Sequence, residues 1–112
     1  MRPIQAGERA PAIPGLQLED GRGIVMFYKV TCPTCQMVAP VAQRLFERFP
    51  GRFAAVAQDP PDRIQDFGRH FGSSFPSLSE PPPYDAANGY GVRSVPTLFV
   101  VDGGSVVDVV ES

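Results

Sequence analysis

The sequence has few cysteine and histidine side chains and lacks the long apolar runs of membrane helices. Its 112 residues include two cysteines, one histidine and no tryptophan. A structural zinc site takes four ligands, so His70 and the two cysteines are too few for one within a single chain. No apolar run approaches the ~20 residues that a membrane helix needs. We therefore expect no metal, no other cofactor and no membrane segment in this chain.

Neither sign of charge is in large excess, with 10 basic and 12 acidic side chains. The formal net charge is -2, which gives no argument for nucleic acid or a membrane surface as a partner. The first eight residues contain no apolar signal core. Two localisations stay open: a cytoplasmic protein, or an exported domain whose signal or anchor is absent from this chain.

The composition and length are those of one globular domain, residues 1–112. Hydrophobic residues make up 43% of the chain and charged residues 20%, which are ordinary values for a globular protein. At this length a chain buries one core and is too short for two. Thirteen prolines and eleven glycines fall mostly between the periodic segments, which indicates well-defined turns.

The two cysteines stand together as Cys32-Pro33-Thr34-Cys35, between an apolar run and a helical pattern that reaches Phe49. At this spacing the two sulfurs can bond or part with little backbone movement. The unpaired N–H groups at a helix N-terminus stabilise negative charge, and a thiolate is the reactive form of cysteine. The position predicts a redox-active dithiol.

The periodicity of the chain predicts an α/β fold. Apolar runs predict strands over 23–30, 52–58, 96–101 and 105–110, and helical spacing predicts helices over 33–49, 59–72 and 84–90. Residues 75–78 fit a short strand or a loop, and 7–21 an extended lead-in that contributes a short edge strand. Pro40 should kink the first long helix without ending it. Asp102-Gly103-Gly104 is a hairpin signal, so the sheet is mixed, with helices on its faces.

Several motifs together resemble the thioredoxin superfamily, and most of all the TlpA-like thiol-disulfide oxidoreductases with an AhpC/TSA-type redoxin lead-in. The resemblance is carried by Gly7-x-x-Ala10-Pro11, Leu16-x-Leu18-x-Asp20-Gly21, Cys32-Pro33-Thr34-Cys35 and the run from Tyr90 through Val95-Pro96-Thr97 to Gly104. It implies a three-layer sandwich that lacks the C-terminal helix of thioredoxin.

The resemblance also implies roles for particular residues. Cys32 would be the exposed attacking thiolate and Cys35 the buried resolving thiol. Pro96 would be a cis-proline facing the disulfide, and Val95 would pair through its backbone with an extended substrate. Pro33 and Thr34, between the cysteines, would also contact the substrate.

The sequence departs from thioredoxin proper at two positions beside the motif. Met26 stands where thioredoxins carry a buried aspartate, and Thr31 replaces the tryptophan before the first cysteine. The departures favour a specialised relative and leave the general base unassigned.

The function expected is thiol-disulfide exchange with protein substrates and an upstream redox partner, in a direction that Pro33-Thr34 does not fix. A peroxiredoxin is one alternative, although its motif places Thr three residues before a cysteine, where this chain has Lys29 and Cys32. A non-catalytic binding domain of the same fold is another.

Other polar and aromatic residues near the motif have simpler interpretations. For Lys29, Glu80 and His70 we favour solvated side chains over catalytic roles, whereas Tyr28 fits the core and the site equally well.

The predicted hairpin leaves one sheet face without a following element to cover it, since the given chain stops at Ser112. Either the natural polypeptide continues past Ser112, or that face is buried against another chain, as in a homodimer.

Overall fold

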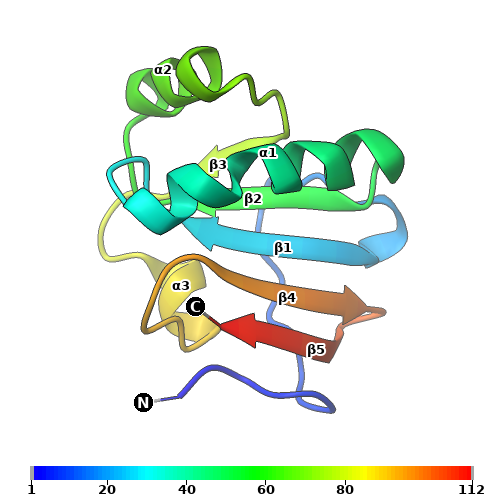
Figure 1. The fold of residues 1–112 in the computed structure, drawn as a ribbon. Coiled ribbons are helices and arrows are strands. Elements are labelled where there is room, and N and C mark those ends of the chain that lie inside the picture. Colours follow the sequence, from blue (N-terminus) through cyan, green and yellow to red (C-terminus); the bar gives the residue numbers. More distant parts are fainter. Residues whose placement is uncertain (1, 112) are drawn as a thin grey trace.

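A computed structural model describes residues 2–111 and contains one five-stranded sheet in the order β3-β2-β1-β4-β5 (Figure 1). The strands are β1 Gly23–Tyr28, β2 Phe53–Ala57, β3 Ser77–Ser79, β4 Thr97–Asp102 and β5 Ser105–Glu111. β1, β2 and β3 run parallel, whereas β4 is antiparallel to β1 and β5 to β4. The predicted mixed sheet is confirmed.

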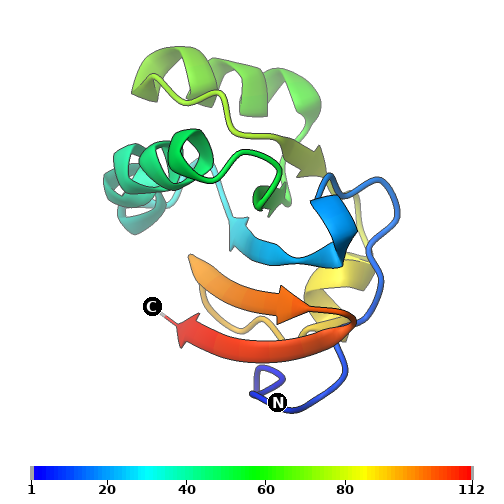
Figure 2. The same ribbon diagram turned by 90° about the vertical axis from the view of Figure 1, so that its right-hand side faces the viewer.

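Helices lie on both faces of the sheet (Figure 2). α1 Pro33–Arg48 and α2 Pro61–Phe71 cover one face, and the short α3 Asp85–Gly89 lies on the other. The three layers are those predicted for a thioredoxin-like fold. Within residues 2–111, none of the helices is both long and apolar enough to cross a membrane.

β1 is the central strand, and its side chains are buried on both faces. Met26 and Tyr28 point into the core beneath α1 and α2. Val25 and Phe27 point into the second core, where the Phe27 ring lies 5.3 Å from the ring of Tyr90. A strand covered on both faces requires a continuous apolar run rather than an alternating one, which is the pattern this segment has.

α1 begins directly at the cysteine motif. Cys32 is the N-cap in an extended conformation, and Pro33 is the first helical residue, where its missing N–H leaves no hydrogen bond unmade. The helix runs on past Pro40 to Arg48, so the proline does not end it. Ala39 and Ala42 are buried against the sheet. These small side chains bring the start of α1, and with it the cysteines, close to β1.

The lead-in segment runs beside the outer edge of β5. The Gly7 N–H donates to the Val106 carbonyl at 2.8 Å, and the Val106 N–H donates to the Glu8 carbonyl at 2.9 Å. The bridge between Arg9 and Ser105 is isolated, so the expected short edge strand is reduced to a single bridge. The lead-in therefore covers only the start of β5.

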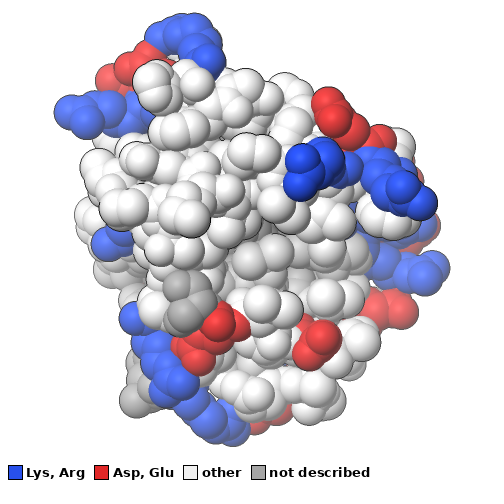
Figure 3. Space-filling view, viewed as in Figure 1, with Lys and Arg blue, Asp and Glu red and all other residues white. Residues whose placement is uncertain are grey.

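An apolar surface lies between α1 and the β4–β5 hairpin. Figure 3 shows the centre of this side of the molecule almost free of charged side chains. Val107 and Val110 of β5 are 54% and 57% exposed, and Val41 of α1 and Phe49, directly after it, are also exposed. A groove of about 320 Å³ lies between the two elements and includes Phe49 and Val107. We call these four side chains the hairpin patch.

Candidate active site

The cysteine motif lies in the connection from β1 to α1, at the carboxyl end of the parallel strands (Figure 1). The Cys32 N–H donates to the Lys29 carbonyl at 3.2 Å, which makes a tight turn directly after the strand. The turn places Cys32 at the helix cap and Cys35 within the first helical turn. Both cysteines are free thiols in the structure.

Cys32 is the more accessible thiol and is only partly buried. Its sulfur accepts a hydrogen bond from the Cys35 N–H at 3.3 Å and donates one to the Val95 carbonyl at 3.6 Å. An N–H aimed at sulfur from the start of a helix favours negative charge on that sulfur. The Cys32 sulfur therefore lies between two backbone groups. The Cys35 N–H stabilises it as a thiolate, and the Val95 carbonyl accepts its proton in a hydrogen bond when it is a thiol.

Cys35 is buried, with 2% of its surface exposed. Burial raises the pKa of its thiol to about 12, and the negative charges of Cys32 and Asp59 act in the same direction. A backbone hydrogen bond from Lys29 opposes these effects. Cys35 is therefore a neutral thiol at physiological pH, and the two cysteines differ in both exposure and charge.

The segment 93–97 forms the second wall of the site. The Val95–Pro96 peptide bond is cis, and the Cys32–Val95 contact joins residues 63 positions apart. The hydroxyl of buried Thr97 donates to the Ser94 carbonyl at 2.7 Å. Arg93 forms a two-pronged ion pair with Glu111, at 2.7 and 2.9 Å.

Four other residues that the sequence pointed to are exposed, whereas Pro96 is not. Pro33 and Thr34 are exposed between the two sulfurs, and Pro96 is buried. Lys29 and His70 are exposed, as expected.

Two side chains of β1 belong to the core behind the site. Tyr28 is 1% exposed, and its hydroxyl shares a hydrogen bond of 2.8 Å with the Ser77 hydroxyl. Burial raises the pKa of this phenol. Met26 is buried in the same core, so an apolar thioether occupies the place of the thioredoxin aspartate.

Glu80 has a structural role that the sequence did not indicate. Its carboxylate accepts hydrogen bonds from the N–H groups of Ala86 and Ala87, at 2.6 and 3.1 Å. These groups lie at the start of α3 and have no partner within that helix. Glu80 is therefore a helix cap, and its interpretation as a solvated loop residue is wrong.

Asp59 is a site residue that sequence reasoning missed. It follows β2 at the same edge of the sheet as the cysteines, and its carboxylate accepts the Val30 N–H at 3.0 Å. The sequence did contain one indication of this role. Asp59 comes two positions after Ala57, a buried strand residue, so its side chain is expected on the same face of the sheet, which α1 covers.

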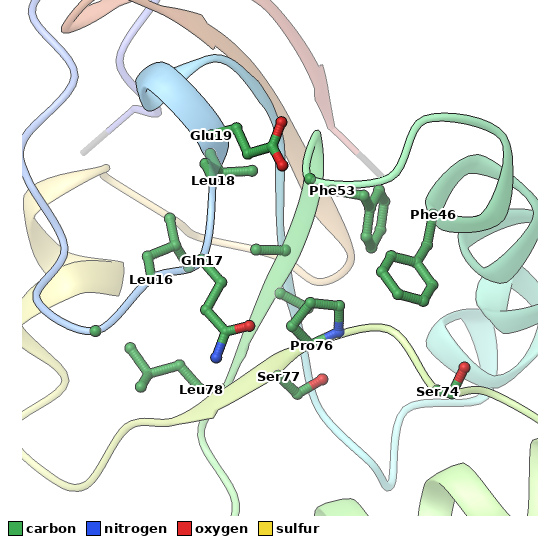
Figure 4. Close-up of a pocket in the computed structure, with 14 residues that line it drawn as sticks. Leu16, Gln17, Leu18, Glu19, Phe46, Phe53, Ser74, Pro76, Ser77 and Leu78 are labelled. Carbon is green, nitrogen blue, oxygen red and sulfur yellow. The ribbon is translucent and has the colours of Figure 1, made fainter.

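A cavity of about 770 Å³ lies away from the dithiol, between the lead-in segment and β3 (Figure 4). Leu18 and Glu19 line one side, with Phe53 and Pro76 opposite. A smaller hollow of about 160 Å³ includes Lys29 and Val95, two residues that contact the cysteine turn or the Cys32 sulfur. Of the two cysteines, the partly exposed Cys32 can be reached from the surface, whereas Cys35 is buried.

Comparisons with known proteins agree with this geometry. Residues 14–110 match the AhpC/TSA family. The chain belongs to that family. Thioredoxin 1 of Nostoc sp. (strain PCC 7120) is 29% identical over 87 residues, which are 78% of this chain and 63% of that protein. This AhpC/TSA chain thus spans less than two thirds of the length of that curated relative.

Two solved structures resemble the AhpC/TSA chain closely. The thioredoxin domain of a thiol-disulfide oxidoreductase from Bacteroides vulgatus superposes with a TM-score of 0.77 at 17% identity, covering 97% of this chain and 91% of that one. The structure of MTB dsbF in mixed oxidized and reduced forms gives a TM-score of 0.72 at 29% identity, covering 83% and 71%. At 17% identity, the likeness to the Bacteroides vulgatus domain shows a shared fold alone. The MTB dsbF structure is the more similar of the two in sequence, at 29% identity.

Proposed function

We propose that this AhpC/TSA-family chain is a thiol-disulfide oxidoreductase that exchanges the Cys32–Cys35 dithiol with a disulfide of a protein substrate. The observation that carries the proposal is the inequality of the two sulfurs. Cys32 is accessible and accepts a helix N–H, whereas Cys35 is buried and protonated. One thiol is suited to attack from outside and the other to resolve from within.

The reaction then proceeds in two exchanges. The Cys32 thiolate attacks one sulfur of the substrate disulfide, and the other substrate sulfur leaves as a thiolate that takes up a proton. Cys35 loses its proton and attacks the Cys32 sulfur of the mixed disulfide, which releases the second substrate thiol. Two electrons have passed to the substrate, and Cys32–Cys35 is a disulfide. An upstream dithiol partner reduces it again, and the same steps in reverse would oxidise a substrate.

The substrate contacts we propose surround Cys32. Val95 lies against the Cys32 sulfur, and its backbone would pair with an extended substrate segment. The cis-proline Pro96 would form the wall opposite the disulfide, and exposed Pro33 and Thr34 would border the approach. The open surface around Cys32 suits a polypeptide better than an enclosed small molecule.

A peroxiredoxin remains the enzymatic alternative, because family membership alone includes it. The residues three positions before the cysteines, Lys29 and Cys32, do not supply the threonine hydroxyl of that motif. A non-catalytic binding domain is the other alternative, and it offers no reason for one exposed and one buried thiol.

Insulin reduction tests the proposed activity. Catalytic amounts of the protein with dithiothreitol should speed precipitation of the insulin B chain, and Cys32→Ser should return the rate to that of dithiothreitol alone. A wild-type rate equal to the Cys32→Ser rate would remove the proposal. Peroxide consumption with the same donor, in the absence of insulin reduction, would favour the peroxiredoxin.

We also propose that the hairpin patch is covered by a second copy of this chain. Its four apolar side chains are exposed, and Phe49 and Val107 border the same groove. Val110→Glu with Val107→Lys should convert a dimer to a monomer in sedimentation, without loss of thermal stability in the monomer. A wild-type protein that sediments as a monomer at all concentrations and binds no apolar dye would contradict this interface.

A further inference from the structure

Asp59 lies opposite the turn that precedes the cysteines. In the parallel register of β1 and β2, Tyr28 pairs with Ala57. The two segments that follow these strands therefore leave the sheet side by side, with Val30 next to Asp59. Ala55 and Ala57 point into the core that contains Cys35. Side chains two positions apart along an extended chain share a face, so Asp59 continues this row toward the start of α1.

Several hydrogen bonds fix the Asp59 carboxylate and the turn that it contacts. The Ser79 hydroxyl donates to the Asp59 carbonyl at 2.6 Å, which anchors its backbone to β3. Asp59 Oδ2 accepts the Val30 N–H at 3.0 Å, and the Gln36 side chain donates to the Val30 carbonyl at 3.0 Å. Val30 is therefore held on both polar groups of its backbone, two residues before Cys32.

The ionisable groups around the Cys35 thiol are few and come from three elements. Cys32 at the start of α1 and Asp59 after β2 disfavour its ionisation by their charge. Tyr28 on β1 interacts electrostatically with both Cys35 and Asp59. Lys29 acts through its backbone, and its side chain is exposed. α2 faces this core with Phe67, which carries no charge.

We propose that Asp59 is a positioning residue for the dithiol, which holds the Val30 amide ahead of Cys32 and places a negative charge at the edge of the core that contains Cys35. The consequence of this role for the reaction rests on the proposed function. Once Cys32 is part of a mixed disulfide its sulfur is neutral, so Asp59 is then the remaining negative charge acting on Cys35. Burial is the main obstacle to ionisation of Cys35, and the Asp59 charge adds to it, which slows the proton loss that resolution of the intermediate requires.

Two substitutions separate the two parts of this role. Asp59→Asn keeps an oxygen that can accept the Val30 N–H and removes the charge, whereas Asp59→Ala removes both. Asp62→Asn is the matched control, because Asp62 is an exposed carboxylate at the start of α2 and its replacement changes the net charge equally.

The first measurement is the ¹³Cβ chemical shift of Cys35 against pH, in a Cys32→Ser background with labelled cysteine. Asp59→Asn should raise the thiolate fraction of Cys35 about threefold at each pH below its midpoint, since removing a nearby like charge favours the charged form. Asp62→Asn should leave the titration unchanged. Superimposable titrations for Asp59→Asn and Asp62→Asn would overturn the electrostatic part.

The second measurement is hydrogen exchange at the Val30 amide. Asp59→Ala should speed this exchange at least about tenfold, because the N–H loses its acceptor, and Asp59→Asn should keep most of the protection. Equal protection in Asp59→Ala and the wild type would overturn the clamp. Neither measurement uses a substrate, so a protein inactive on insulin would still give both results, and the two proposals fail separately.

Discussion

Cys35→Ser is expected to stop turnover at the mixed disulfide and to trap the substrate on Cys32. The attack by Cys32 needs only the accessible sulfur and its helix N–H, both of which the substitution leaves in place. Resolution, however, depends on a thiol held next to that sulfur. Because an intramolecular group acts at an effective concentration far above that of free dithiothreitol, insulin turnover should fall by on the order of 10²-fold or more.

The trapped species is observed by non-reducing electrophoresis and intact-mass spectrometry after incubation with oxidised insulin. Cys32→Ser is the matched control, since it keeps one thiol but places it at the buried position, where we expect no adduct. Serine is close in size to cysteine, and thermal unfolding of each variant checks that the fold is retained. Equal adduct formation by the two variants would show that the roles of the thiols are not the ones proposed.

Much of the fold could be predicted from the periodicity of the chain. The run from Gly23 is apolar at every position because β1 is buried on both faces, which identified a central strand. Gly103 and Gly104 take the positive φ values, 59° and 85°, that a two-residue hairpin turn requires. The three residues of β3 could not be separated from a loop, because so short a segment shows no clear period and depends on pairing with β2.

The site was predictable where chemistry depends on spacing along the chain. Cys32 and Cys35 are three residues apart at a helix start, which is a local pattern. The contact of Cys32 with Val95 joins distant segments, and only the family resemblance indicated it. Asp59 and Glu80 were missed or misjudged because their roles come from backbone N–H groups of other segments. Such partners become visible only when the chain is folded.

Iodoacetamide is expected to alkylate the reduced protein at one thiol, Cys32, when added at pH 8. Only the thiolate reacts, and with a pKa of about 12 the Cys35 thiol is ionised to roughly one part in 10⁴ at that pH. Peptide mass spectrometry should therefore find Cys35 modified about 10³-fold more slowly in the native protein than in denaturant, where its pKa returns to its usual value of 9, with burial adding to the difference. In denaturant the two rates should converge, which controls for reagent and sequence effects. Comparable rates in the native protein would contradict the raised pKa.

The same raised pKa has a consequence for stability, with a sign that can be derived. The Cys35 pKa lies near its usual value of 9 in the unfolded chain and near 12 in the folded one. Below pH 9 both states hold the proton, and the contribution to stability is complete. As the pH rises from 9 toward 12 the unfolded chain loses its proton first, so stability falls, by at most about 1.4 kcal/mol per pH unit. Cys32→Ser, whose single thiol is Cys35, should lose stability over this range relative to the variant in which serine replaces both cysteines. The free energy of unfolding of both variants is measured with denaturant from pH 9 to 10.5. If it changes with pH at the same rate in the two variants, the buried thiol ionises as readily in the folded protein as in the unfolded chain.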